Sequence, residues 1–511
     1  MVDRLRTLAW WLRTSLALGV GILAALAFQP VGWWPLIFVA VAGFTLLTAT
    51  ARGWGSGLLA GLFFGIGFMA IALTWMQVIF VEAMLGLVAL ESLFYAGVGA
   101  LTRLAAGRRF FPLLAAGAWS VGEFAFSRFP FEGFGWMRLA YAVVDTPLAG
   151  LLPFVGVAGV SFLTALIGQL AAHALLNAPP TRRWRPATAA MAIFLVGFGG
   201  ALYGPGAAAG SVSVGYVQGN APGGGVYGLG TPRAITVNHV AETERLAARF
   251  RSGELPTPDF VAWPENGTDM DPFLDATTAA LVARALAAAG IPILVGTITD
   301  GPGPNERQTA SLWWHPSRGV EARYDKRNIV PFGEWVPYRE FLEPLFPVVS
   351  YVGAQSVAGT KPGVLAVTLD DGRGVRVGDL ICFDVAYGET VYDTVRHGAQ
   401  VLIVQSSNAM YTGTGQIHQQ FAITRARAAE LRREILVVTT TGTSGLINPD
   451  GSVVFTAPEA QPVSGVLDLP LRDNVTPATW LAPILDAGLP VITLVALAGT
   501  LTTARRRSPT P

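Results

Sequence analysis

The stretch Val375–Asp384, V-R-V-G-D-L-I-C-F-D, decides how the second half of this chain is interpreted. Its first part, Val375–Ile381, is a short apolar-rich run, which predicts a mostly buried β-strand. Cys382 follows this strand directly, and it is the single cysteine among 511 residues. No intramolecular disulfide can form, so this thiol is expected to be buried, reactive or paired with another chain.

Two further polar residues stand at predicted strand ends. Glu265 lies in W-P-E-N after the run Phe260–Trp263, and Lys326 lies in Y-D-K-R after Ala322–Tyr324. Each residue alone has an ordinary explanation: a turn glutamate, a solvated lysine, a cysteine acting as a small hydrophobe. Together they suit nucleophilic catalysis, because a carboxylate can activate a thiol and a lysine can stabilise an oxyanion. Strand ends can converge on one crevice, where we expect these three groups to meet.

The segment 211–473 around these residues predicts one domain in which strands alternate with helices. Mixed elements with mostly buried strands favour a layered α/β sandwich, preceded by a Gly/Pro-rich linker at Gly204–Gly210. A late hairpin is expected around the turn Asn448–Gly451. The other predicted strands are Val212–Val217, Ile293–Thr297, Ser311–His315, Val401–Val404 and Ile435–Thr439, and the predicted helices are Val237–Ser252, Thr277–Ala289 and Ala422–Arg433.

The rest of the chain predicts a multi-span α-helical membrane bundle. The chain is 52% hydrophobic and only 14% charged, against about 25% charged residues in soluble domains. A crossing helix needs about 20 apolar residues, and we expect seven spans in residues 1–205, an eighth in 480–503 and a basic tail in 504–511. The first span is not followed by a cleavage signal, so no cleaved signal peptide is expected. The expected spans are Trp10–Phe28, Trp34–Thr50, Gly57–Phe80, Met84–Leu101, Pro112–Phe126, Leu148–Leu176, Thr188–Tyr203 and Leu481–Leu501.

Arginine placement predicts the orientation, because basic residues concentrate in cytoplasmic loops. With eight spans, nearly all arginine clusters fall on one side, which is taken as cytoplasmic, and 211–473 is then extracytoplasmic. The opposite short loops hold only Arg128 and Arg138. The clusters on the basic side are Arg4, Arg6 and Arg13; Arg52; Arg103, Arg108 and Arg109; Arg182, Arg183 and Arg185; and Arg505, Arg506 and Arg507.

Two acidic residues, Glu91 and Glu123, fall within predicted spans. Either they bond to neighbouring helices or lie near an interface, which is the favoured interpretation, or they contact a substrate headgroup. Net charge near zero gives no reason to expect a nucleic-acid partner. The five histidines show no metal-ligand spacing, so no metal site is expected.

The strings around Glu265, Lys326 and Cys382 resemble those of the nitrilase, or carbon–nitrogen hydrolase, superfamily, which uses a Glu-Lys-Cys triad in this chain order. The resemblance covers the whole soluble domain and implies an α-β-β-α sandwich. A nitrilase-like domain between seven N-terminal spans and one C-terminal span further resembles the apolipoprotein N-acyltransferase family. Three strings add to this: N-I-V-P-F-G-E-W-V-P at Asn328–Pro337, Q-G-N at Gln218–Asn220 and the aromatic loop Phe131–Trp136. The abundance of Ala, Arg and Gly is typical of a high-GC genome such as that of an actinobacterium.

The resemblance implies a role for each matching residue. Glu265 would be the general base, Lys326 would stabilise the oxyanion, Cys382 would be the nucleophile and Glu334 would support the site. The backbone N–H of Phe383 would add to the oxyanion hole. The sequence departs from the family at Phe383 and Asp384, where Tyr and Glu are common, and at Tyr227, which replaces a frequent tryptophan. The string S-S-N-A-M-Y-T-G, Ser406–Gly413, lacks the aspartate and tryptophan of better-known members.

The implied reaction passes a fatty acyl chain from a membrane phospholipid, through a thioester, to the α-amino group of a diacylglyceryl-cysteine on a lipoprotein at the bacterial cytoplasmic membrane. The segment Trp335–Val352 carries many large apolar residues, among them Trp335, Phe341, Leu345 and Phe346. It is either a buried loop or a lid that dips into the bilayer, and the lid is favoured because the segment shows no regular period. Two other functions stay open: a membrane-tethered amidase that passes its acyl group to water, and a non-enzymatic lipid-binding module.

Overall fold

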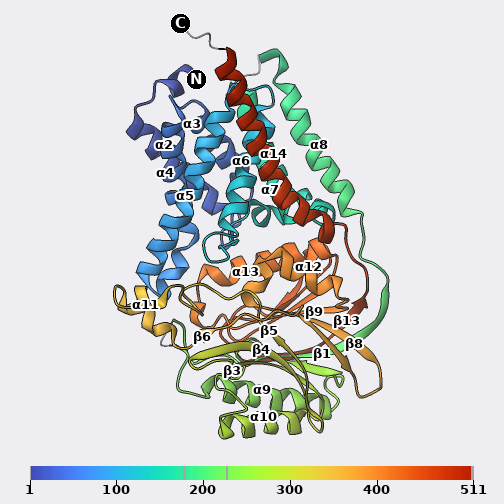
Figure 1. Ribbon diagram of the computed structural model, residues 1–511. Helices are drawn as coiled ribbons and strands as arrows, with labels where there is room; N and C mark the ends of the chain where they lie inside the picture. Colours follow the sequence, from blue (N-terminus) through green and yellow to red (C-terminus); the bar gives the residue numbers. More distant parts are fainter. Residues whose placement is uncertain (1, 177–179, 226–227, 508–511) are drawn as a thin grey trace. The chain divides into compact units, whose positions relative to one another are not determined.

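The structure is a computed structural model that describes residues 2–176, 180–225 and 228–507. It divides into two compact units, a helical unit of Met1–Tyr203 with Thr476–Pro511 and an α/β unit of Gly204–Val475 (Figure 1). Each unit is described separately below.

Eight long helices build the helical unit within the described part of the chain. Four segments are long and apolar enough to cross a membrane: α4, α5, η3 with α7, and α14 as far as Gly499. The helices α2, α3 and α6 are apolar but shorter, so this unit is that of a membrane protein. The helices are α1 (Val2–Arg6), α2 (Trp10–Leu26), α3 (Pro35–Ala49), α4 (Trp54–Ala72), η1 (Thr74–Val78), α5 (Val81–Ala105), α6 (Phe111–Phe126), η2 (Leu139–Val143), η3 (Pro147–Leu151), α7 (Leu152–Leu176), η4 (Pro180–Arg182), α8 (Trp184–Ala201) and α14 (Ala478–Arg507).

Two expected spans are interrupted in the structure. The segment expected to run from Gly57 to Phe80 divides into α4 and the 3₁₀ helix η1, and Leu73 between them has non-helical backbone angles (φ −105°, ψ 14°). The segment expected from Leu148 begins as the 3₁₀ turn η3, and Gly156 has φ 62° inside α7. Hydropathy averages over such breaks and does not reveal them.

Close approach of α4 and α5 depends on small residues that face each other. A Cβ atom on Gly61 would lie 2.2 Å from the Tyr95 carbonyl oxygen, and one on Gly99 would lie 2.3 Å from the Gly57 carbonyl oxygen. Small residues of this kind let membrane helices pack backbone to backbone.

A buried ion-pair network joins α6, the segment after it, and α14. Arg138 donates from Nε to Glu123 at 2.9 Å and from a terminal nitrogen to Asp486 at 2.5 Å. Arg128 pairs with the other Asp486 oxygen at 2.8 Å. Glu123 also accepts from the Leu139 N–H at 2.8 Å, so it bonds to neighbouring parts of the bundle. The other acidic residue of the expected spans, Glu91, is buried in α5, and its Oε2 has no hydrogen-bond partner among the described residues.

The α/β unit consists of two stacked sheets with helices on both outer faces, so the expected α-β-β-α sandwich is confirmed (Figure 1). The first sheet has the order β13-β1-β2-β3-β4-β5, with β6 paired to β4, and the second has the order β12-β11-β10-β9-β8-β7. The strands are β1 (Ala208–Gln218), β2 (Phe260–Ala262), β3 (Ile293–Asp300), β4 (Glu306–His315), β5 (Gly319–Asp325), β6 (Gln355–Ser356), β7 (Val364–Thr368), β8 (Gly374–Ile381), β9 (Val401–Ser406), β10 (Ile435–Thr439), β11 (Gly445–Ile447), β12 (Val453–Thr456) and β13 (Val463–Arg472), and the helices are α9 (Ala234–Arg251), α10 (Ala276–Ala289), α11 (Arg339–Leu342), η5 (Pro347–Val352), η6 (Cys382–Ala386), α12 (Gly388–Arg396), η7 (Ala409–Tyr411) and α13 (Gly415–Leu431).

Strand directions bring the functional residues to one edge of the sandwich. In the first sheet β2 runs parallel to β3, and β5 runs in the same direction because β4 is antiparallel to both β3 and β5. In the second sheet β8, β9 and β10 are parallel. A core of buried residues such as Phe260, Trp313 and Ile403 fills the space between the sheets and fixes their stacking.

Candidate active site

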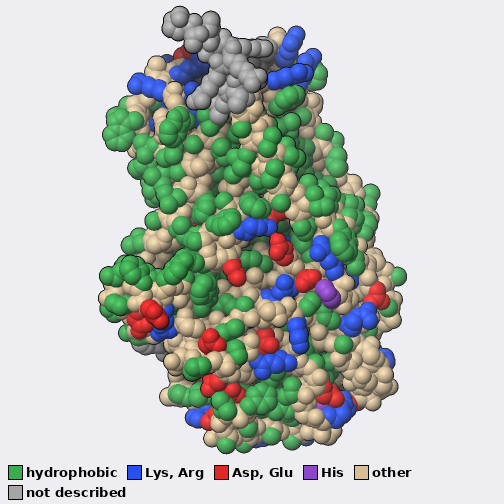
Figure 2. All heavy atoms as spheres, viewed as in Figure 1, with side chains coloured by type: hydrophobic (Ala, Val, Ile, Leu, Met, Phe, Trp, Pro, Cys, Tyr) green, Lys and Arg blue, Asp and Glu red, His purple; other side chains and the backbone are tan. Residues whose placement is uncertain are grey.

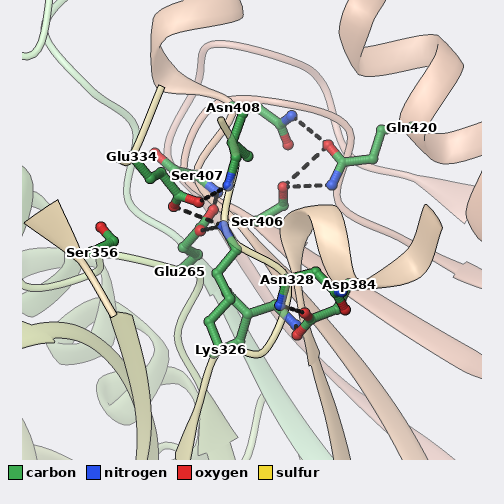
Figure 3. Close-up of polar contacts among 12 residues, drawn as sticks. Glu265, Lys326, Asn328, Glu334, Ser356, Asp384, Ser406, Ser407, Asn408 and Gln420 are labelled. Atoms are coloured by element: carbon green, nitrogen blue, oxygen red, sulfur yellow. Dashed lines mark hydrogen bonds and ion pairs between the residues drawn. The ribbon is translucent and has the colours of Figure 1, made fainter. Parts of the chain in front are cut away.

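Lys326, directly after β5, lies between two carboxylates. Its Nζ donates to Glu265 Oε1 at 2.9 Å and to Glu334 Oε1 at 2.8 Å (Figure 3). The lysine is 1% exposed, so this ammonium is compensated by the two acids rather than by solvent. Burial alone would lower the pKa of Lys326, but the charges of Glu265 and Glu334 outweigh it and hold the pKa well above its ordinary value. The lysine therefore stays a cation at neutral pH.

Glu265 is fixed from both sheets. Its second oxygen, Oε2, accepts from the Ser407 N–H at 2.9 Å, just beyond the end of β9. Its backbone rests on Gly296 of β3, where a Cβ atom would lie 2.0 Å from the Pro264 carbonyl oxygen and 2.9 Å from Glu265 Cα. Glycine is therefore required at position 296, and the carboxylate has little freedom to move.

Cys382 stands on a tight turn at the end of β8. Its backbone has φ 50°, in the left-handed region, which costs about 1–3 kcal/mol for a non-glycine residue unless neighbouring contacts hold it. Asp384 supplies such contacts, since its carboxylate accepts from the Ile381 N–H at 3.0 Å, the Asn328 N–H at 2.9 Å and the Tyr324 hydroxyl at 2.8 Å. Although position 384 holds Asp in place of the family's Glu, its buried carboxylate still joins the segment after β5, which carries Lys326, to the turn at Cys382.

The surroundings of Cys382 keep its thiol protonated. The residue is partly exposed, and desolvation, reinforced by the Glu265 charge, raises the pKa of the Cys382 thiol to about 12. Lys326 and a hydrogen bond with Ser406 act in the opposite direction but do not outweigh them. A thiol with this pKa is neutral at physiological pH, so attack on a substrate requires a base that removes the proton during the reaction.

A polar network at the end of β9 was not singled out from the sequence. Asn408, with φ 52°, donates to the side-chain oxygen of Gln416 at 2.8 Å. Asn408 also donates to the side-chain oxygen of Gln420 at 2.7 Å, and Gln420 donates to Ser406 at 2.9 Å (Figure 3). The network holds the segment that contacts both Glu265 and Cys382. The sequence offered one signal for these residues: Ser406–Asn408 stand at the end of a buried strand, and Glu265, Lys326 and Cys382 also stand at strand ends.

Tyr411 is a further member of this site. Burial, together with the nearby Cys382 thiol, raises the pKa of the Tyr411 hydroxyl above its ordinary value. The phenol therefore stays protonated beside Cys382.

The segment Trp335–Val352, here named the lid, has a small core of its own and an apolar outer face. Val336, Val349 and Val352 are buried together, whereas Phe341 is 70%, Leu345 59% and Phe346 54% exposed. Trp335 is only partly exposed. The lid begins directly after Glu334 and ends shortly before Ser356. The Ser356 N–H donates to the Glu334 carbonyl at 2.9 Å, so the two ends of the lid are held together.

Two remaining expected residues take different places. Phe383 is buried, and its ring contacts that of Tyr387 with centroids 5.1 Å apart. Tyr227 lies outside the described residues.

Comparison with known proteins covers nearly the whole chain. Residues 20–170 match the family model of the apolipoprotein N-acyltransferase N-terminal domain, and residues 242–470 match that of carbon–nitrogen hydrolases. The chain is 35% identical to an apolipoprotein N-acyltransferase of Mycolicibacterium smegmatis, over 93% of this chain and 83% of that protein. It is 25% identical to one of Photobacterium profundum, over 93% and 91%. Among solved structures, an amidase from Nesterenkonia sp. AN1 aligns with 51% of this chain and 94% of its own, at 17% identity and a TM-score of 0.37.

Proposed function

The chain belongs to the apolipoprotein N-acyltransferase family, and we propose from this membership that it moves a fatty acyl chain from a membrane phospholipid to the α-amino group of the N-terminal diacylglyceryl-cysteine of apolipoproteins. The observation that carries the proposal is the Lys326 ammonium held between Glu265 and Glu334 beside the single cysteine. Cys382 is the proposed nucleophile, Glu265 the general base and Lys326 the oxyanion stabiliser.

In the first half-reaction the Cys382 sulfur attacks the ester carbonyl carbon of the phospholipid. The thiol proton moves to Glu265 while the carbonyl oxygen becomes an oxyanion beside Lys326. When the intermediate collapses, the ester C–O bond breaks and Glu265 returns its proton to the departing lysophospholipid alkoxide. A thioester on Cys382 remains.

The charge of the cluster supports this assignment of roles. Before attack the buried groups are Glu265⁻, Lys326⁺, Glu334⁻ and a neutral thiol, with a net charge of −1. In the tetrahedral intermediate Glu265 is neutral and the oxyanion carries the negative charge, so the net charge is again −1. A change of net charge in a buried site is costly. Transfer of the Cys382 proton to Glu265 avoids this cost, because it keeps the net charge of the cluster at −1.

In the second half-reaction the lipoprotein amine attacks the thioester carbonyl. Its proton passes to Glu265, the C–S bond breaks, and the Cys382 sulfur recovers the proton. The site is then restored without any co-reactant. Glu334 has a positioning role, because it shares the Lys326 ammonium and accepts from the Val330 N–H at 2.8 Å.

The membrane setting completes the proposal. Both substrates are lipid-anchored, and we assign the exposed apolar face of the lid to acyl-chain capture. Eight crossings, with the arginine-rich side in the cytoplasm, would put the α/β unit on the extracytoplasmic face of the bacterial cytoplasmic membrane.

Mass spectrometry of the Cys382 peptide tests the mechanism. After incubation with phospholipid, the wild-type protein should carry a hydroxylamine-sensitive acyl mass on this peptide, and Cys382→Ala should carry none. Cys382→Ser should lose turnover, because an alkoxide is harder to form and a poorer leaving group than a thiolate. Acyl transfer by wild type that occurs without any acyl-enzyme, or transfer by Cys382→Ala, would rule out the covalent route.

A further inference from the structure

The helical unit contains a basic cavity that shares no residue with the catalytic cluster. Its volume is about 420 Å³, and Arg6, Arg52 and Arg103 line it together with apolar side chains that include Phe111 and Leu176. It lies where α3, α5 and α7 end and where α4 and α6 begin. Figure 2 shows blue Lys and Arg side chains gathered at the end of the helical unit that carries α1. The surface of the unit next to this basic end is largely apolar.

Within the described part of the chain, no acidic side chain of the cavity wall neutralises its positive charge. Arg6 pairs with one described residue, Asp3, at 3.8 Å, and the two side chains are 68% and 97% exposed. Exposed pairs of this kind contribute little. Arg52 makes no hydrogen bond or ion pair with the described residues and is exposed.

Four other arginines of the helical unit have partners within the protein. Arg128 and Arg138 pair with Asp486 and Glu123. Near the cavity, Arg13 and Arg103 instead donate to backbone carbonyls at the end of α3, Arg103 to Ala51 at 2.6 Å and Arg13 to Leu47. These two arginines therefore have structural tasks, and Arg6 and Arg52 are left facing the cavity.

We propose that this cavity binds the phosphate of an anionic phospholipid from the arginine-rich side of the membrane. Guanidinium groups bind phosphate oxygens through paired hydrogen bonds, and basic pockets between membrane helices suit such headgroups. A lipid is favoured over free phosphate because Phe111 and Leu176 give the cavity an apolar wall on which the glycerol and first methylenes can pack. The cavity also falls in the range of about 300–1,000 Å³ that is typical of small-molecule sites.

Native mass spectrometry of the full-length protein in detergent tests this site. All samples carry Cys382→Ala, so that no lipid is consumed. The probes are short-chain phosphatidylglycerol, phosphatidylcholine and inorganic phosphate. The test variant is Arg6→Gln with Arg52→Gln, and the matched control is Arg4→Gln with Arg109→Gln. All four arginines are exposed, both variants remove two charges, and the control residues do not line the cavity.

The test variant should bind phosphatidylglycerol at least about tenfold more weakly than the Cys382→Ala protein with all its arginines, because a hydrogen bond to a charged group contributes about one decade or more in affinity. The control variant should bind it as that parent protein does, and phosphatidylcholine should bind more weakly than phosphatidylglycerol to the parent. Equal losses in the two variants would mean that only surface charge attracts the lipid and would overturn the site. Displacement of the lipid by phosphate at equal concentration would overturn the assignment to a lipid.

Discussion

Glu265 Oε2 accepts a hydrogen bond of 2.9 Å from the backbone N–H of Ser407. Glu265 follows a strand of the first sheet, and Ser407 follows a strand of the second. The base of the proposed mechanism is therefore held by the sheet that carries the nucleophile, so the relative position of the two groups depends on how the sheets stack.

Replacing Glu265 with Gln should affect thiol reactivity and acyl transfer in opposite directions. The Glu265 charge raises the pKa of the Cys382 thiol, so its removal should speed alkylation by iodoacetamide near neutral pH. The gain is about threefold for each unit by which the thiol pKa falls, because roughly tenfold more thiolate is partly offset by its lower nucleophilicity. Acyl-enzyme formation should fall by about 10²–10⁴, because the general base is lost. Because Cys382 is the single cysteine, whole-protein mass spectrometry measures both reactions.

The control for this comparison is Glu254→Gln, a substitution of an exposed glutamate in the same unit, which should change neither rate. If Glu265→Gln slowed alkylation as well as acylation, the Glu265 charge would not be what keeps the Cys382 thiol protonated in the resting enzyme.

Asp379 should make the stability of the α/β unit depend on pH. Burial raises the pKa of the Asp379 carboxyl from 3.8 to about 8, so the folded protein keeps a proton that the unfolded chain releases. Stability should then fall by roughly 1.4 kcal/mol for each pH unit between the two pKa values. Asp379→Asn removes this dependence, and its melting temperature relative to wild type should rise by several degrees between about pH 6 and about pH 8.

The exposed Asp371 provides the control for this pH effect. Arg373 lowers the pKa of the Asp371 carboxyl, so Asp371→Asn should shift the melting temperature by the same amount at both pH values. A constant difference between wild type and Asp379→Asn over this range would mean that Asp379 is ionised in the folded protein.

The strands that carry the proposed triad could be predicted because their signal is local. The runs before Glu265 and Cys382 are apolar, and the structure has β2 and β8 there. The contacts of Asp384 and Ser407 could not be predicted, because they join segments that are distant in sequence. The segment Ala422–Arg433 was the expected helix, whereas α13 begins at Gly415. Its first turns hold Gln416 and Gln420, which resemble loop residues until their bonds to Asn408 are known.

The lid shows another limit of sequence reasoning. No regular period predicts its two short helices, because α11 has four residues and η5 six. Its apolar content was evident, but the division between the buried Val336, Val349 and Val352 and the exposed Phe341 and Phe346 required the structure.

Polar substitutions on the lid should damage phospholipid turnover selectively. Burying one large apolar side chain contributes about 1.5–3 kcal/mol, which is about tenfold to a hundredfold in lipid capture. Phe341→Ser and Phe346→Ser should therefore reduce turnover of a phospholipid donor by this factor and leave a short soluble ester nearly unaffected. Rates with the two donors, measured on the same preparations, check the effect.

Leu274→Ser is the matched control, because Leu274 and Phe341 are both 70% exposed in the same unit. It should change neither rate. Equal losses for the two donors in the Phe341 variant would make the lid part of the folded core, and efficient hydrolysis of the soluble ester without transfer to an amine would favour the amidase.

Reporter fusions should establish the orientation. Alkaline phosphatase is active only outside the cytoplasm, so a fusion at Gly206 should be active and one after Arg507 inactive if eight helices cross the membrane with the arginines inside. Immunoblots of both fusions control for expression. The reverse pattern, or activity at both positions, would exclude this topology.

The pairing of Asp486 with Arg128 and Arg138 has a consequence for biosynthesis. The two arginines leave the ribosome early, whereas their acidic partner lies in α14, after the whole of Gly204–Val475. Until α14 is made, Glu123 is the one member of this network available to Arg138. Closure of the bundle by its last helix thus waits for translation of the α/β unit, so a chain truncated before α14 leaves the buried Arg138 and the partly buried Arg128 without the Asp486 carboxylate.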